Sequence, residues 1–397
     1  MVEQLFSRLE GLFPELVKVR RDLHMYPELS FQEENTPQKI SDYLKGLGLE
    51  VRTEVGGRGV VGLLKGGKPG KTVALRADFD ALPIQDEKVV EYKSRIPGVM
   101  HACGHDLHTA ALLGVAKVLS EVKSELQGNV VFIHQFAEEV IPGGAKPMIE
   151  DGCLDRVDVI YGAHVMSDIP VGTVGIKDGY MMAAGDTFEI EIHGKGAHGA
   201  LPHLSVDPLV AGSQLVLNLQ QIVSRRVDPL KPTVISIGSF QSGQAYNVIP
   251  HTAKLNGTVR TFDEDVRDLV EEAMGQIVKT TCEGAGADVK FEYRRGYPAV
   301  WNHVEETKKV EVLAAMIFGV DKIKHVPPMM GMEDFAYYLK KVPGCFFFVG
   351  GQNPDIEATY PHHHPKFDVD ERAILQIGKL FVSVVLYELS DGAIKPA

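Results

Sequence analysis

The sequence is poor in several features that would define its class. Its four cysteines, Cys103, Cys153, Cys282 and Cys345, lie far apart and form no Cys-x-x-Cys pair. This pattern is typical of reduced thiols rather than of a disulfide framework. No apolar run approaches the roughly 18 residues that span a bilayer, and no basic stretch followed by an apolar core stands near the N-terminus. We therefore expect a cytoplasmic protein without a secretory signal or a membrane partner.

Positive charge is also scarce. The 397 residues include 41 Lys and Arg against 53 Asp and Glu, which gives a net charge of −12. Such a chain lacks the cationic field that nucleic acids or anionic lipids require, so we expect no nucleic-acid partner. A hydrophobic content of 44% and a charged content of 24% are those of an ordinary globular protein. The length predicts two domains, or one large domain that carries an insertion.

Apolar runs alternate with helical patterns in the first half of the chain. We expect strands at residues 59–64, 73–77, 130–136 and 157–163. A long helical pattern covers residues 106–126, and Thr36-Pro37 is typical of a helix start. Strands and helices that alternate in this way predict an α/β fold, with a mostly parallel or mixed sheet covered by helices.

The pattern changes near residue 184, where apolar and polar residues begin to alternate as in a half-buried strand. The expected elements that follow are a helix at 206–225, strands at 234–240 and 253–262, and a helix at 264–282. This β-α-β-β-α-β order predicts a small two-layer α+β domain. We place it as an insertion at 184–294, inside a larger α/β domain made of 1–183 and 295–397.

The first pattern resumes after the insertion. We expect helices at 305–318, 332–341 and 370–389, and a strand at 345–350.

Polar side chains follow three of the expected strands at the point where each ends. Asp78 and Asp80 follow the second strand, Glu138 and Glu139 the third, and His164 the fourth. Open α/β sheets place their sites at the carboxyl ends of the strands, so we expect one shared site. Adjacent side chains of an extended chain face opposite ways, so one acid of the pair could bind metal while the other faces a substrate. The alternative is a pair of surface acids at a helix start.

Two histidine-rich segments are further candidates. His101, Cys103, His105 and His108 lie within eight residues, and a Cys and a His two apart can bind one metal ion or two neighbouring ions. The alternative for this segment is a loop that caps the following helix. The triplet at 362–364 contains either a further ligand or only a solvated loop.

Other catalytic templates are absent. The sequence contains no H-E-x-x-H, no G-x-S-x-G and no G-x-G-x-x-G after a strand. Residues 66–72 look like a phosphate-binding loop, but Lys65 stands where the first glycine of that motif is required. We interpret this segment as a hairpin turn between two strands.

Eight short motifs stand in order over nearly the whole chain. They are LRADFDALP at 75–83, MHACGHD at 100–106, AEE at 137–139, GAH at 162–164, GKGAH at 194–198, NVIP at 247–250, GTVR at 257–260 and MEDF at 332–335. With these motifs the sequence resembles the clan of dinuclear metallohydrolases that includes aminoacylases, hippurate hydrolases and plant auxin-conjugate hydrolases. The wider clan has a metal-binding histidine where Asp78 stands, which leaves the role of Asp78 open.

The resemblance implies a centre of two divalent ions. By position in the motifs, Cys103 bridges the ions, His105 and His164 bind one of them, and Glu139 and His363 bind the other. His363 is chosen from the histidine triplet because the family ligand stands two residues before a proline. A mixed Cys, His and Glu set suits zinc, manganese, cobalt or nickel and disfavours calcium or magnesium; zinc or manganese is our first expectation.

The resemblance also implies roles around the centre. Glu138 is the general base, and His198 stabilises the oxyanion, often in the active site of a partner subunit. Asn247 and Arg260 match residues that hold the free carboxylate of the substrate. The inserted domain is then a lid and dimerisation domain, and we expect a homodimer or a higher homo-oligomer.

The predicted function is metal-dependent hydrolysis of N-acyl-L-amino acids, small molecules such as N-acetyl or N-benzoyl amino acids. The same reading follows from the chemistry, because two ions that share a thiolate can activate water and polarise an amide carbonyl. A di- or carboxypeptidase of the same clan is the first alternative. A non-catalytic protein that binds metal or amino acids is the second.

Overall fold

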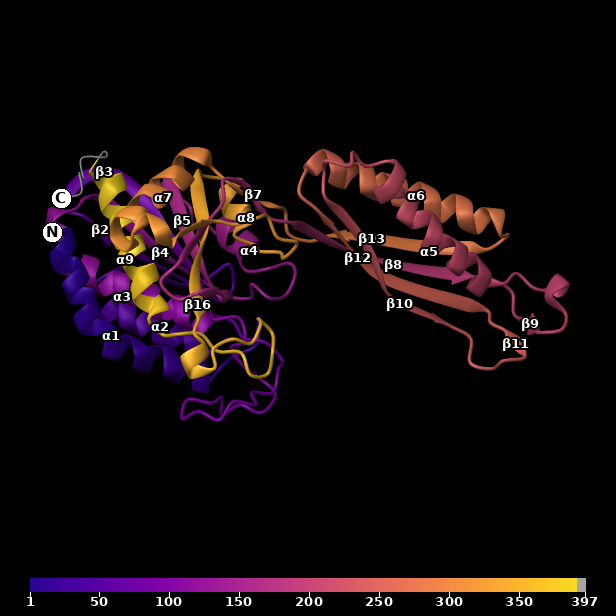
Figure 1. The fold of residues 1–397 in the computed structure, drawn as a ribbon, viewed down its shortest axis with the longest axis horizontal. Helices are drawn as coiled ribbons and strands as arrows, with labels where there is room; N and C mark the ends of the chain where they lie inside the picture. The colour runs from indigo at the N-terminus through magenta and orange to yellow at the C-terminus, as the bar shows by residue number, and fades with distance from the viewer. Residues whose placement is uncertain (391–397) are drawn as a thin grey trace. The chain divides into compact units, whose positions relative to one another are not determined.

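The computed structural model describes residues 1–390, which form two compact units (Figure 1). The first unit contains Met1–Met181, Trp301–Pro327 and the segment from Asp334 onward. The second contains Met182–Val300 and Pro328–Glu333; we call it the inserted unit. No helix within residues 1–390 is both long and apolar enough to cross a bilayer.

The first unit is built on an eight-stranded sheet with the order β1-β2-β4-β3-β5-β16-β6-β15. The strands are β1 (Glu50–Val55), β2 (Gly59–Lys65), β3 (Lys68–Asp78), β4 (Gln127–Gln135), β5 (Val159–Pro170), β6 (Val174–Ile176), β15 (Ile323–His325) and β16 (Gly344–Gln352). The central strands β4, β3, β5 and β16 run parallel, whereas β1, β2 and β6 add antiparallel pairs. This mixed sheet confirms the predicted α/β class.

The turn between β2 and β3 is not the hairpin that the sequence suggested. β4 lies between these strands, antiparallel to β2 and parallel to β3. The turn instead bonds to the segment that leads into β4: Gly66 N donates to the carbonyl of Gly128, and Gly67 N donates to that of Lys123. A side chain on either glycine would collide with this backbone, so the glycines serve close packing rather than phosphate binding.

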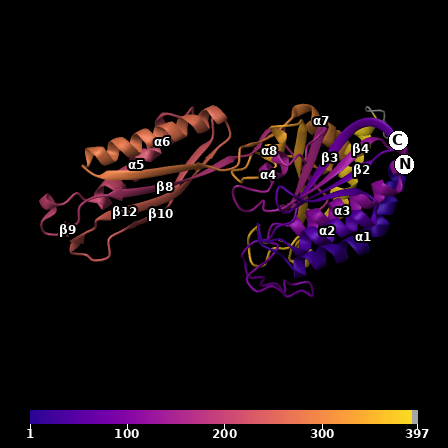
Figure 2. The ribbon, with the colours of Figure 1, turned by 180° about the vertical axis from the view of Figure 1, so that it is seen from behind.

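Helices cover the sheet of the first unit (Figure 2). They are α1 (Val2–Met25), α2 (Asn35–Gly46), α3 (His105–Glu121), α4 (Ala145–Glu150), α7 (Val304–Phe318), α8 (Ala336–Leu339) and α9 (Ala373–Leu389). α3 and α9 pack on the central strands, and α1 packs on both helices. α3 and α9 are buried along most of their length, as expected for helices that are apolar on nearly every face.

Several expected helix boundaries in the first unit are wrong: the helix expected at 106–126 ends at Glu121, and the one expected at 370–389 begins at Ala373. Two further differences have a visible cause. The helix predicted to start at Thr36-Pro37 begins at Asn35, because the carboxylate of Glu28 accepts hydrogen bonds from the backbone N–H groups of Asn35 and Thr36 and replaces a local cap. The helix expected at 332–341 is only the four-residue α8, since Asp334 is held in a buried network by Arg76 and Gln135.

The inserted unit is a four-stranded antiparallel sheet with the order β10-β12-β8-β13, covered by two helices (Figure 1). Its elements are β8 (Ala184–His193), α5 (Pro208–Arg225), β10 (Thr233–Ser242), β12 (Thr252–Thr261), α6 (Glu264–Gly284) and β13 (Asp288–Arg295). The carboxylates of Asp207 and Asp263 cap the two helices. The element order is the predicted β-α-β-β-α-β.

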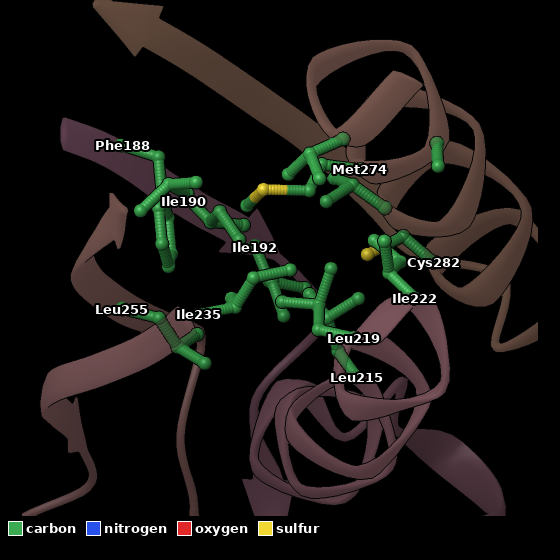
Figure 3. Close-up of a cluster of buried hydrophobic side chains, with 14 of the residues drawn as sticks. Phe188, Ile190, Ile192, Leu215, Leu219, Ile222, Ile235, Leu255, Met274 and Cys282 are labelled. Atoms are coloured by element: carbon green, nitrogen blue, oxygen red, sulfur yellow. The ribbon is translucent and has the colours of Figure 1, made fainter. Parts of the chain in front are cut away.

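The inserted unit has its own hydrophobic core (Figure 3). Alternate residues of β8, Phe188, Ile190 and Ile192, point toward the helices and meet Leu215 of α5 and Met274 of α6. Two short strands, β9 (Ala197–His198) and β11 (Val248–Ile249), pair at one end of the unit. A further pair consists of β7 (Gly179–Met182) and β14 (Val300–Asn302).

Candidate metal centre

The carboxyl ends of β4, β3 and β5 meet at one edge of the first unit's sheet. The three strands are neighbours and run parallel, so the residues that follow them come together. β3 ends at Asp78, β4 leads to Glu138 and Glu139, and His164 lies within β5. The loop before α3, which carries Cys103, reaches the same place.

The structure brings all five predicted metal ligands together in two groups. One potential ligand atom from each of Cys103, His105 and His164 lies within 4.8 Å of the others, and the same holds for Cys103, Glu139 and His363. Cys103 belongs to both groups. Two ions that share one thiolate sulfur would need this arrangement.

Hydrogen bonds leave the same nitrogen of two histidines directed to the centre. Nδ1 of His105 lies 3.0 Å from the carbonyl oxygen of Asp80 and 3.1 Å from its carboxylate. Nδ1 of His164 lies 2.8 Å from the carbonyl oxygen of Val165, and its Nε2 lies 3.5 Å from Sγ of Cys103. Because Nδ1 of each ring then carries the proton, Nε2 has a lone pair for a metal ion.

Buried polar atoms without partners mark the place for a cation. Nε2 of His105 and Oε1 of Glu139 are buried and have no hydrogen-bond partner, and they lie 3.9 Å apart. Oε2 of Glu139 lies 3.4 Å from Nε2 of the half-exposed His363. Such atoms are costly to bury unpaired, and divalent ions held by this thiol, imidazole and carboxylate set would pair them. The donor set therefore fits the expected ions.

The electrostatics of the centre also favour added positive charge. Burial, followed by the nearby charges of Glu139 and Glu138, holds the pKa of the Cys103 thiol well above its usual range. Burial lowers the pKa of His105, but the carboxylates of Asp78 and Asp80 outweigh it and raise that pKa to about 10. A bound divalent ion would reverse both effects, since it stabilises the thiolate and the neutral imidazole.

The structure shows what Asp80 does. Besides His105, its carboxylate accepts hydrogen bonds from the hydroxyl of Ser30 at 2.7 Å and from the backbone N–H of Glu139 at 3.0 Å. Asp80 thus orients one residue from each ligand group.

Asp78 has different partners. Its carboxylate lies 2.5 Å from Nη1 of Arg76 and 2.7 Å from Nδ1 of His108. Nε2 of His108 accepts the backbone N–H of Val165, so both nitrogens of this ring are used and His108 is not available as a ligand. His101 is fully buried but belongs to neither ligand group. Burial lowers its pKa to about 4.

Sequence reasoning missed the network beneath the centre. The buried Arg76 binds Asp78, Gln135 and Asp334, and Gln135 in turn donates to Asp334. The only signal in the sequence was the charged pair Arg76 and Asp78 inside an apolar strand, where an unpaired charge would be costly.

Two predicted residues of the inserted unit lie at its β9–β11 end. His198 is exposed in β9, opposite Val248 of β11, and its Nδ1 accepts the backbone N–H of Ala200. The carbonyl of Asn247 accepts the backbone N–H of Gly199 at 2.8 Å, which ties Asn247 to the His198 loop.

Arg260 lies elsewhere in the inserted unit. It is half-buried near the end of β12, opposite Gly185 of β8, and its Nη1 donates to Thr258 and to the carbonyl of Val259. Among residues 1–390 it has no carboxylate within ion-pair distance, and Asp263, a nearby acid in the sequence, pairs with Lys231 instead. Burial lowers the pKa of Arg260.

Comparison with known proteins identifies a family and relatives of this chain. The sequence matches peptidase family M20/M25/M40 over residues 74–387. An N-acyl-L-amino acid amidohydrolase of Geobacillus stearothermophilus is 46% identical over 303 residues, 76% of this chain and 82% of that protein. Thermostable carboxypeptidase 1 of Saccharolobus solfataricus is 40% identical over 395 residues, 98% of this chain and 99% of that protein.

A solved structure agrees in fold. The Bacillus subtilis YXEP protein, described as a dinuclear metal-binding peptidase of the M20 family, superposes with a TM-score of 0.83 at 37% identity and covers 96% of this chain and 99% of that one. The chain therefore belongs to peptidase family M20/M25/M40. The family expected from the motifs is confirmed, and so is a metal-dependent hydrolase that acts on amides.

Proposed function

We propose that this protein hydrolyses the amide bond of N-acyl-L-amino acids with the help of two divalent ions. Zinc and manganese are the ions that we propose first. The observation that carries the proposal is the pair of ligand groups that share Cys103, with Glu138 beside them: one ligand atom each of His105, Glu138 and Glu139 also lies within 4.8 Å of the others. The likeness to the Geobacillus amidohydrolase supports the substrate class.

In the proposed reaction Glu138 is the general base. The chemistry that the bound ions supply is polarisation of the amide carbonyl and a lowered pKa of water. Glu138 takes the proton from the attacking water and returns it to the nitrogen of the leaving amino acid, which contributes about 10²–10⁴-fold to the rate. Its buried position beside the ligand groups, with 6% of the residue exposed, keeps bulk water from competing for that proton.

We place the substrate's free carboxylate on Arg260 and Asn247, and the oxyanion on His198. These residues cannot serve one substrate from one chain. Arg260 lies near the carboxyl end of β12. The pair of β9 and β11 lies beyond the opposite end of that strand, which begins at Thr252 (Figure 1). Eight residues of strand separate the ends by roughly 27 Å, which supports His198 and Asn247 from one subunit acting with Arg260 of another.

An exposed apolar surface of the inserted unit supports a dimer. Val210 and Leu217 of α5 and Phe240 of the edge strand β10 are exposed apolar residues. An edge strand and an apolar helix face that remain in water are costly and are commonly covered by a second chain. We therefore propose a homodimer, or a larger assembly based on it, through the inserted unit.

A carboxypeptidase is the second candidate, since the Saccharolobus carboxypeptidase matches 98% of this chain. The two reactions share the centre and the carboxylate site but differ in what lies on the acyl side. A panel of N-acetyl, N-benzoyl and dipeptide substrates of the same amino acids, tested on metal-loaded protein, separates them. Faster turnover of the N-acyl series supports our proposal, faster turnover of peptides favours the carboxypeptidase, and bound metal without hydrolysis would leave a binding protein.

A further inference from the structure

The turn that presents the two acids has an unusual backbone. Ala137, directly before Glu138, has a φ of 50°. Few residues other than glycine adopt this left-handed conformation, because the side chain crowds the backbone. Such a turn persists only where its surroundings hold it.

Two buried carboxyl groups hold this turn at alternate amides. Glu33 accepts the backbone N–H of Ala137 at 2.9 Å, and Asp80 accepts that of Glu139 at 3.0 Å. The carbonyl of Ala137 accepts the N–H of Gly144 at 3.1 Å. The residue between the two held amides is Glu138.

The segment that contains Glu33 packs along the same turn. The ring of Phe31 contacts that of Phe136 edge to face, with centroids 5.7 Å apart, and Ser30 binds Asp80. Three residues of this segment therefore support residues 136–139: Glu33 and Phe31 directly, and Ser30 through Asp80.

Glu33 is an energetically unfavourable residue at this position. Its side chain is fully buried, and Oε2 has no hydrogen-bond partner. Burial, with a smaller contribution from Asp80, raises the pKa of Glu33 to about 8. A buried carboxyl group with one unused oxygen lowers stability, so a functional demand at Ala137 explains why the position is not apolar.

We propose that Glu33 is a positioning residue, which holds the amide of Ala137 and so fixes the direction of Glu138. It acts through the backbone, not by transferring a proton itself. The role rests on the proposed function, in which Glu138 is the base. A displacement of about 1 Å in a catalytic group can cost about 100-fold in rate, so we expect a large effect from a small movement of the turn.

Three substitutions at Glu33 separate the hydrogen bond from the charge. Glu33→Gln keeps an oxygen that can accept the Ala137 amide and removes the carboxyl group. Glu33→Asp keeps the carboxyl group and shortens its reach by about 1.5 Å, one carbon–carbon bond. Glu33→Leu removes the acceptor at similar size. Glu34→Leu is the control, since Glu34 is the exposed neighbour and makes no side-chain cap bond to α2.

Two readouts test the proposal on the metal-loaded protein. The first is kcat and KM for the best N-acyl substrate, with metal content measured beside them. The second is hydrogen exchange at the Ala137 amide, which does not depend on activity. We expect Glu33→Leu and Glu33→Asp to lower kcat by about 10- to 100-fold with KM and metal content unchanged, and to speed exchange at Ala137. Glu33→Gln and Glu34→Leu should resemble the wild type in both.

Two outcomes overturn the proposal. The first is wild-type kcat and wild-type exchange in Glu33→Asp; this variant decides the matter if Glu33→Leu does not fold. The second is a loss of kcat in Glu33→Gln while the Ala137 amide stays protected, because that result makes the acidic proton essential. A wild-type protein inactive on every N-acyl substrate would reject the proposed function instead, and unchanged exchange in Glu33→Asp would then still reject the amide contact.

Discussion

Nε2 of His164 lies 3.5 Å from Sγ of Cys103, although His164 belongs to the central strand β5 and Cys103 to the loop before α3. The sulfur also belongs to the group with Glu139 and His363. Cys103 is thus the one predicted ligand shared by the two groups.

Metal analysis should find two divalent ions per chain, and Cys103→Ala should lose both or bind them much more weakly. The reason is that removal of a shared ligand weakens both ions, whereas removal of an unshared ligand weakens one. Cys153→Ala is the control, since Cys153 is buried outside both groups. A single tightly bound ion that gives full activity would disprove the bridging role.

The adjacent acids should differ in function. Glu138→Gln is expected to keep both ions and lose at least about 100-fold in kcat, as for loss of a general base. Glu139→Gln should lose an ion and part of the thermal stability, because metal binding adds to the free energy of unfolding. Metal content, kcat and Tm of both variants decide this. Loss of metal in Glu138→Gln with turnover retained would mean that the two roles are reversed.

His198 should act across a dimer. Inactive Glu138→Gln protein and inactive His198→Ala protein, mixed under conditions of subunit exchange, should then form some sites with both groups intact and regain part of the activity. Mass spectrometry of labelled chains verifies the exchange. If exchange is complete and no activity returns, His198 acts within its own chain or has no catalytic role.

Arg260→Ala should weaken recognition of the substrate carboxylate. A charge-assisted hydrogen bond contributes about 1.5–3 kcal/mol, which predicts a loss of roughly 10- to 150-fold in kcat/KM. The loss should appear with an N-acetyl amino acid and be small with its C-terminal amide. Arg294→Ala is the control, because Arg294 forms exposed ion pairs on β13. An equal loss on both substrates would make Arg260 a structural residue.

Asp368 should contribute stability that acid removes. Burial raises the pKa of this carboxyl, but the charges of Arg20 and Lys88 outweigh it and hold that pKa at about 2. Since the folded-state pKa lies below the unfolded value of about 3.9, the stabilisation is complete above that value and is lost as the pH falls toward 2. The full contribution is about 2.6 kcal/mol, and about half of it is gone at pH 3.

Urea unfolding of metal-free wild type and Asp368→Asn between pH 3 and pH 7 tests this. The stability difference between the two proteins should shrink by about 1 kcal/mol over that range. Asp321→Asn, at an exposed surface position, should show no such trend. A difference independent of pH would contradict the ionised state of Asp368.

Much of the fold could be predicted because its signals are local. Continuous apolar runs indicated the central strands, and the alternation of Phe188, Ile190 and Ile192 indicated β8. The pairing of strands is not local, so the sequence did not reveal that β4 separates β2 from β3. The helix α1 carries a visible stripe, Leu5, Leu9, Leu12 and Leu16, yet was not predicted.

The motifs identified the candidate metal ligands, but they did not identify the residues that hold the site in position. Glu33 stands 104 residues before Ala137 in the sequence. Nothing in its neighbourhood distinguishes it from the exposed Glu34. Only the packing of the Phe31 segment along the turn at Ala137 reveals that one of the two acids is buried.

The order of the sheet has a consequence for synthesis on the ribosome. One edge of β5 pairs with β3, which is made earlier. Its other edge pairs with β16, and 173 residues lie between Pro170 and Gly344. At about 5–20 residues per second this edge stays open for roughly 10–35 s. The core of the inserted unit comes from residues 188–293 and is complete within that interval. The nascent chain should therefore fold its later-begun unit first, while an unpaired apolar strand of the earlier one needs protection from other chains.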